Sequence, residues 1–79
     1  MVTVLRVEGL RIVIFSNDHE PAHVHVFGDG EAKINLLGDE GNAELVWTVG
    51  FSRADVRRAV AVVDDHREML LTRWSEMHG

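Results

Sequence analysis

The segment at residues 17–27, NDHEPAHVHVF, holds three of the five histidines in this 79-residue chain. Its second half alternates His23 and His25 with apolar residues, which predicts a strand that presents both imidazoles on the same face. The strand rise puts their α-carbons about 6.5–7 Å apart, close enough for the two rings to share one metal ion. A pair of histidine ligands is therefore the first chemistry that the sequence suggests.

A third ligand is expected from the residues just before this strand. The bend at Pro21 can return His19 to the same side, and Asp18 can serve as an oxygen ligand or as the partner of a ring N–H. A site with three histidines and an open coordination position is typical of catalytic zinc rather than of structural zinc. We therefore predict zinc or another divalent transition metal as the cofactor, with the metal ligands His19, His23 and His25.

Two other interpretations of the histidines stay open. Clustered imidazoles titrate near neutral pH, so one of them can act as a general base or a pH sensor without a metal. Alternatively, the rings lie on the polar face of a sheet and bond only to one another, to water or to a partner chain. A His-x-His pair on a strand is a weak motif by itself, and the sequence leaves open whether the protein is an enzyme.

The elements that position these residues are strands over the first two thirds of the chain. Short apolar or alternating runs, rich in valine and isoleucine, are separated by residues that favour turns. The short links favour antiparallel neighbours and hence a meander. The runs predict a sheet of four or five strands, drawn from residues 2–7, 11–16, 22–27, 31–36 and 43–49.

The last third of the chain has the period of a helix. Ser52 with Asp55 forms a variant of the capping box, which predicts one long C-terminal helix over about residues 53–77. Its apolar residues gather on one arc that should lie against one face of the sheet. Arg67 interrupts this arc, so its guanidinium must reach solvent or meet a carboxylate, and we take it as a candidate binding residue. Trp47 and Trp74 are expected in the core.

Together these elements predict one α+β domain over residues 1–79: an antiparallel meander sheet with one helix packed on one face. The face that carries the histidines is left half open. A chain of this length builds only a small core. We therefore predict that a second copy or another protein covers part of that face, as a homo-oligomer or a heterocomplex.

Composition narrows the class of protein. Thirteen acidic and eight basic residues give a net charge of −5, and the basic residues are scattered, so nucleic-acid binding is not expected. The chain has no cysteine, which excludes disulfides and thiolate metal sites. Neither a secretion signal nor a run long enough to cross a membrane is recognisable, so we expect a soluble cytoplasmic protein.

Three stretches of the chain resemble the bacterial family called domain of unknown function 4160: TVLRVEGLRIVIFSNDHEPAHVHV, GEAKINL and GFSRADVRRAVAVVDDHREMLLTRW. The resemblance depends on the histidine segment, on the GFS triplet at residues 50–52 and on residues 67–74. Two positions depart from the family pattern. Ala22 stands where members usually have a second proline, and His66 where they usually have asparagine.

The resemblance implies a small cytoplasmic protein that often pairs with another small domain, encoded nearby in operons that resemble toxin–antitoxin modules. It assigns no catalytic residue. We therefore predict a protein-binding component of a toxin–antitoxin-like pair. The alternative is a small metal-dependent hydrolase or nuclease that uses the histidine-rich site.

Overall fold

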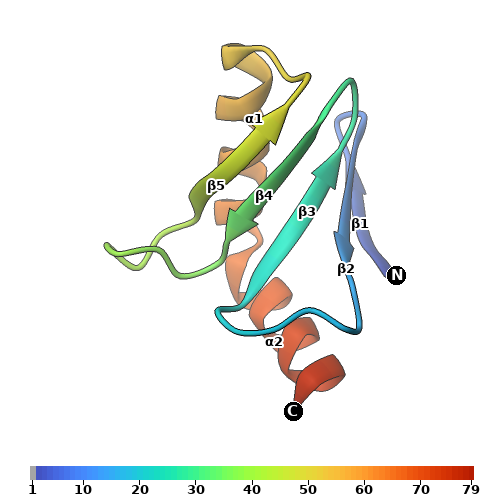
Figure 1. Ribbon diagram of the computed structural model, residues 1–79, viewed down its shortest axis with the longest axis vertical. Coiled ribbons are helices and arrows are strands. Elements are labelled where there is room, and N and C mark those ends of the chain that lie inside the picture. The colour runs from blue at the N-terminus through green and yellow to red at the C-terminus, as the bar shows by residue number, and fades with distance from the viewer. Residues whose placement is uncertain (1) are drawn as a thin grey trace.

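The computed structural model describes residues 2–79, in which five strands form one antiparallel sheet in chain order (Figure 1). The predicted α+β class and meander topology are confirmed. The ends of the five strands differ from the expected positions by no more than two residues. The strands are β1 (Val2–Val7), β2 (Leu10–Ile14), β3 (His23–Phe27), β4 (Glu31–Asn35) and β5 (Glu44–Val49).

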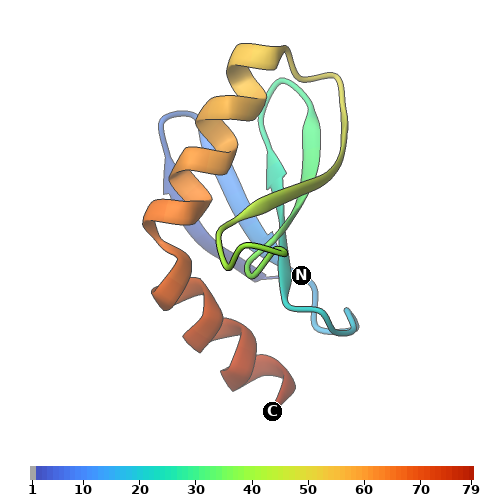
Figure 2. The same ribbon diagram turned by 90° about the vertical axis from the view of Figure 1, so that its left-hand side faces the viewer.

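The main core lies between one face of this sheet and helix α1 (Arg53–Asp65), which crosses that face (Figure 2). Alternation supplies its side chains, because every second residue of the inner strands points to the helix. Ile12, Val24 and Ile34 are fully buried there. Ser52 begins the helix as predicted, since its hydroxyl oxygen accepts a hydrogen bond from the backbone N–H of Asp55 at 3.1 Å.

The prediction of one long C-terminal helix is wrong, because the chain forms two helices that meet at His66. There φ is −108° and ψ is 15°, outside helical values. The ring Nδ1–H of His66 donates to the Val62 carbonyl at 2.8 Å. The backbone N–H of His66 is shared between the carbonyls of Val62 and Val63, 3.2 Å from each. This sharing tightens the last turn of α1 and ends it, so α2 (Arg67–His78) starts in a new direction.

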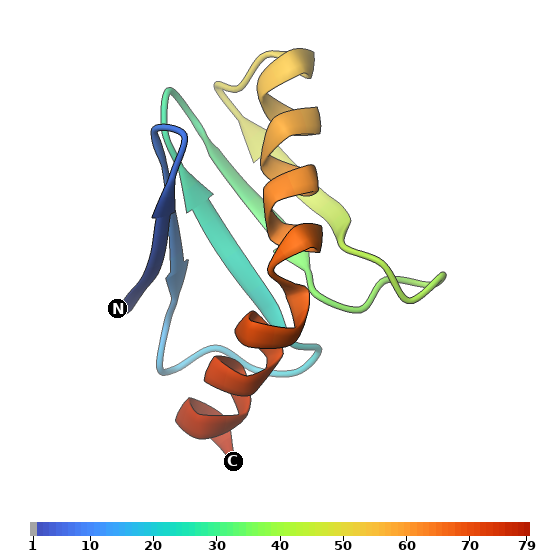
Figure 3. The same ribbon diagram turned by 180° about the vertical axis from the view of Figure 1, so that it is seen from behind.

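The change of direction carries α2 past the end of the sheet, next to the loop that joins β2 and β3 (Figure 3). The indole N–H of Trp74 donates to Glu20 in this loop at 3.2 Å. Trp74 is buried, as expected for a core residue. None of the helices among residues 2–79 is long and apolar enough to cross a membrane.

Trp47 does not lie in the main core, and that part of the sequence prediction is wrong. Its side chain is 39% exposed. Trp47 is the cross-strand neighbour of Lys33, which in turn faces His25, so all three lie on the face opposite α1. Because β5 is an edge strand, only one neighbouring strand supplies side chains to cover the indole ring.

Candidate metal centre

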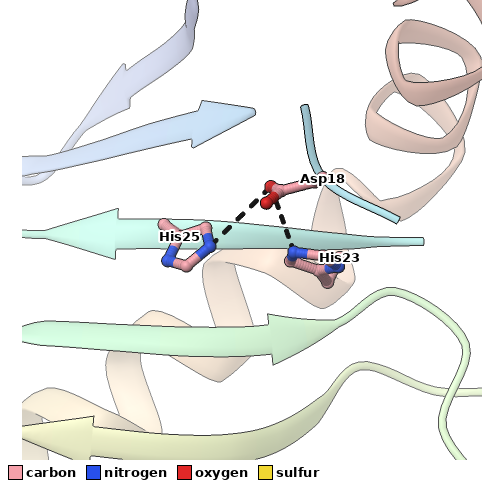
Figure 4. Close-up of side chains that lie close together, drawn as sticks. All are labelled: Asp18, His23 and His25. Atoms are coloured by element: carbon pink, nitrogen blue, oxygen red, sulfur yellow. Dashed lines mark ion pairs between the residues drawn. The ribbon is translucent and has the colours of Figure 1, made fainter. Parts of the chain in front are cut away.

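Three side chains that can bind a metal converge on the sheet face opposite α1 (Figure 4). His23 and His25 come from β3, and Asp18 comes from the loop between β2 and β3. One donor atom of each lies within 4.8 Å of the others. The two imidazole rings are side by side, with their centroids 5.4 Å apart. Alternation along β3 therefore brings the histidines together, and the loop adds a carboxylate.

Three hydrogen bonds hold the loop in place, one within it, one to α2 and one to the residue that follows β4. The Asp18 N–H donates to the Phe15 carbonyl at 3.1 Å, which makes a turn directly after β2. Glu20 accepts the indole N–H of Trp74 from α2. The carbonyl of Ala22 accepts the N–H of Leu36 at 3.0 Å. The Glu20–Pro21 peptide bond is cis. These contacts fix the path that aims Asp18 at β3.

The ring of His23 has its proton on the side away from Asp18. Its Nδ1 lies 2.9 Å from the Pro21 carbonyl. A carbonyl only accepts hydrogen bonds, so Nδ1 carries the hydrogen, and in the neutral ring Nε2 then has a free lone pair. Nε2 lies 3.1 Å from Oδ2 of Asp18. In the neutral ring, two lone pairs thus face each other at short range unless a cation or a proton lies between them.

The carboxylate of Asp18 also has an oxygen atom to which no group donates a hydrogen bond among residues 2–79. Its Oδ2 is buried and has no hydrogen-bond partner among residues 2–79, although His23 Nε2 is close. The angle at which the ring approaches therefore does not make a hydrogen bond. Buried carboxylate oxygens are nearly always bonded to a donor or to a metal ion. This oxygen is the atom at which a missing positive partner is most needed.

His25 completes the cluster as a neutral ring. Its Nε2 is 3.8 Å from Oδ2 of Asp18, and its Nδ1 is 3.4 Å from Oε2 of Glu31. Burial lowers the pKa of His25, His23 lowers it further, and the carboxylates of Asp18 and Glu31 oppose these effects. The net shift is downward. A lowered pKa favours the unprotonated ring, which is the form that binds metals.

Aromatic side chains surround the two imidazoles. Phe15 and Trp47 meet His25 edge-on, with ring centroids 4.8 and 6.0 Å from it. Trp74 packs on His23 at 5.1 Å. As a result the side chains of His23 and His25 are only 5% and 12% exposed, and that of Asp18 is 19% exposed. The carboxylate is the most exposed of the three side chains, and the aromatic rings strengthen electrostatic interactions at the cluster because they exclude water from it.

The spacing of the donor atoms suits a small divalent ion. Zinc bonds of about 2.0–2.2 Å at tetrahedral angles put neighbouring ligand atoms about 3.3–3.5 Å apart. The two distances to Oδ2, 3.1 and 3.8 Å, lie on either side of that value. Two histidines and one carboxylate are the donors of many catalytic zinc sites and of non-haem iron(II) sites. Three protein ligands leave coordination positions open for water or a substrate.

The two histidines differ in the outer partners that metal-bound imidazoles need. The Pro21 carbonyl is placed to accept the Nδ1–H of His23 at 2.9 Å. Glu31 Oε2 lies 3.4 Å from Nδ1 of His25, which forms no hydrogen bond among residues 2–79, so Glu31 must move slightly closer to accept its N–H. Such partners fix the tautomer and the orientation of the ring. Sequence reasoning missed this role of Glu31. The signal was the turn at residues 28–30, which pairs Glu31 with Phe27 and so places it diagonally from His25.

Two of the residues singled out in the sequence lie elsewhere. His19 is exposed and is not one of the three converging side chains, and Asp18 occupies the place expected for it. Arg67 lies at the junction of the two helices, where its guanidinium donates to Asp64 at 2.6 Å and to Asn42 at 3.4 Å. Asp64 also accepts the backbone N–H of Ala43 at 3.0 Å. These contacts tie the segment before β5 to the helices.

Comparison with known proteins gives one match. Residues 9–75 match the family model described as Domain of unknown function (DUF4160), and this span includes every residue of the cluster. No curated protein and no solved structure matches the chain.

Proposed function

Because the chain belongs to the DUF4160 family, a domain of unknown function, we propose its activity from the site alone: it binds one divalent transition metal ion through Asp18, His23 and His25. The ion is zinc or a metal of similar ligand preference. With open coordination positions, such a site supports metal-assisted hydrolysis of a small substrate. His19 is left out of the proposed ligand set because it is exposed.

One observation carries this proposal: Oδ2 of Asp18 is buried, 3.1 Å from Nε2 of His23, and lacks a hydrogen bond among residues 2–79. A metal ion held by both atoms accounts for this arrangement. The competing explanation is a protonated His23 that forms an ion pair with Asp18. It fits less well, because a ring N–H aimed at Oδ2 would make a hydrogen bond, and the observed approach does not.

The surroundings of the site support hydrolytic chemistry on small molecules. A bound metal would supply a Lewis acid and lower the pKa of a water ligand. The chain itself would hold the two rings in place through Pro21 and Glu31 and exclude bulk water with aromatic side chains. The net charge of −5 disfavours a polyanionic substrate such as nucleic acid. A small uncharged or cationic substrate suits the site better.

The proposal is tested by metal analysis of protein purified without a histidine tag. After exposure to zinc and removal of excess metal, we expect about one ion per chain in the wild type and far less in Asp18→Asn and His25→Gln. His19→Ala is the matched control, because it removes an exposed histidine from the same loop and should keep the full metal content. A wild type that holds far below one ion per chain would contradict the proposal.

A second candidate function is partner binding within a toxin–antitoxin-like pair, in which a different small protein, rather than a second copy of this chain, covers strand β5. Strand β5 presents large apolar side chains to solvent, among them Val46, Trp47 and Val49. Contiguous exposed apolar surface is typical of protein–protein contacts. Purification of the protein from its native cells under gentle conditions should then return a small protein partner in comparable amount. Recovery of the chain without such a partner would count against this function.

A further inference from the structure

Strand β5 ends the sheet and has an outer edge that no other strand covers among residues 2–79. Exposed edge strands are usually protected by charged residues or proline, because they attract other chains. The sequence of β5, ELVWTV, has only Glu44 for this purpose, at its first position. Val46 and Val49 are 46% and 69% exposed, so the edge is apolar as well as open.

The apolar surface continues from β5 into a groove beside α1. Two hollows of about 350 and 500 Å³ adjoin there, since Val56 and Arg57 line both. Leu45 and Phe51 line the first hollow, and Val60 lines the second. Among residues 2–79, α1 crosses this face and α2 adds Leu70 and Trp74 to the core, but neither helix fills the two hollows between α1 and β5. Edge and groove together form one strip, defined here as the β5 strip.

The two ends of the β5 strip carry opposite charges. Asp39, Glu40 and Glu44 lie in or just before the start of β5, whereas Arg53 and Arg57 follow its end on α1. All five side chains are exposed. None of them forms an ion pair within residues 2–79, unlike the arginines at positions 58, 67 and 73. The strip therefore has an acidic end and a basic end, both without partners inside the chain.

We propose that the β5 strip binds the same strip of a second copy, antiparallel, about a twofold axis near the middle of β5. In that orientation the acidic end of each copy lies beside the basic end of the other, and the complementary charges meet twice. The apolar side chains of β5 are then buried between the copies. None of the three metal ligands lies in the β5 strip, so dimerisation and metal binding can be tested independently.

The form of β5 favours a second copy over an arbitrary extended peptide. Its register with β4 shifts so that Lys33 faces Trp47 and Ile34 faces Leu45, which leaves Val46 as an extra, bulged residue. A bulge interrupts the regular ladder that strand addition needs. Side chains and end charges must then supply much of the contact. A reversed copy of the same strip matches those charges at both ends without further assumption.

Sedimentation equilibrium of the full chain tests the proposal. We expect a reversible dimer at concentrations on the order of 100 μM and a weakening of at least roughly tenfold in Val46→Lys, because a charge then lies in the buried middle of the contact. Leu37→Lys is the matched control. Leu37 is also exposed and apolar but precedes the β5 strip, so this variant should dimerise like the wild type. Circular dichroism checks that both variants are folded.

A charge exchange gives a second test that does not depend on the middle of β5. Glu44→Arg and Arg53→Glu each turn an attraction into a repulsion, twice per dimer, so each alone should weaken dimerisation roughly tenfold. The double variant restores opposite charges and should return to within roughly threefold of the wild type. A wild type that stays monomeric at about 500 μM would overturn the proposal. So would a dimer unaffected by all these changes, or a different protein bound stoichiometrically to β5.

Discussion

The substitution Asp18→Asn separates the two states that the geometry of the cluster allows. In a metal site, the metal-free protein has a carboxylate oxygen and a lone pair of His23 facing each other at 3.1 Å. An amide at position 18 can turn its NH₂ group toward His23 Nε2 and form a hydrogen bond worth about 0.5–1.5 kcal/mol. For a domain of this size that gain raises the melting temperature by roughly 2–12 °C. We therefore expect the metal-free variant to be at least as stable as the wild type.

The same substitution should abolish stabilisation by metal. Zinc at 100 times its dissociation constant stabilises the folded wild type by about 2.7 kcal/mol. This corresponds to a rise of roughly 11–22 °C in melting temperature. The variant lacks the anionic ligand, so most of that rise should disappear. His19→Ala should show the wild-type rise, because His19 is exposed and outside the converging group.

Scanning calorimetry at pH 8, with a chelator and then with zinc, measures both effects on the same samples. At this pH an imidazole is ordinarily neutral, so an ion pair with a carboxylate forms only where the folded structure stabilises the protonated ring. If the cluster is instead an ion pair between protonated His23 and Asp18, the metal-free variant should melt at least about 4 °C below the wild type. That result, together with a zinc effect that survives in the variant, would show that Asp18 and His23 form an ion pair and not a metal site.

Three further predictions concern the neighbours of the site and the helix junction. Burial lowers the pKa of His25 below its ordinary 6.5, so the folded, metal-free protein binds fewer protons than the unfolded chain between the lowered value and 6.5. Stability to urea should therefore be complete above pH 6.5 and fall as the pH drops through this window, and the fall should be smaller in His25→Gln. Glu31→Ala removes the outer partner of His25 and should weaken zinc binding roughly 10- to 100-fold by calorimetric titration, without changing the stoichiometry. Arg67→Ala breaks the contacts to Asp64 and Asn42 and should cost about 0.5–1 kcal/mol of stability to urea, while zinc affinity stays unchanged; a loss of zinc affinity would place Arg67 at the site after all.

Local patterns were enough to predict the sheet and to bring together two of the three converging side chains, His23 and His25. Alternation of two residues in β3 depends only on backbone geometry, so the shared face of His23 and His25 followed from the sequence. The sequence did not show that Asp18, and not His19, would join these two histidines. Asp18 and His19 lie in a loop whose path is held by the bond between Glu20 and Trp74, residues 54 positions apart. A contact of that range leaves no periodic signal in the loop.

The helix break and the position of Trp47 were missed for related reasons. The apolar arc continues across His66, so periodicity favoured one helix, whereas the ring of His66 bonds back to the Val62 carbonyl and ends α1. The alternation of Trp47 with Leu45 correctly indicated a strand. Whether the side chains of such a strand are buried depends on its place in the sheet. Strand β5 lies at the edge, and Trp47 stays partly exposed there.

A crystal of the zinc-loaded protein will show whether Asp18, His23 and His25 hold one metal ion. We expect an anomalous scattering peak about 2.0–2.2 Å from Nε2 of His23, Nε2 of His25 and a carboxylate oxygen of Asp18. His19 should remain in solvent. A zinc-loaded crystal with no peak between these atoms, or with zinc bound only at surface histidines, would contradict the proposed metal site.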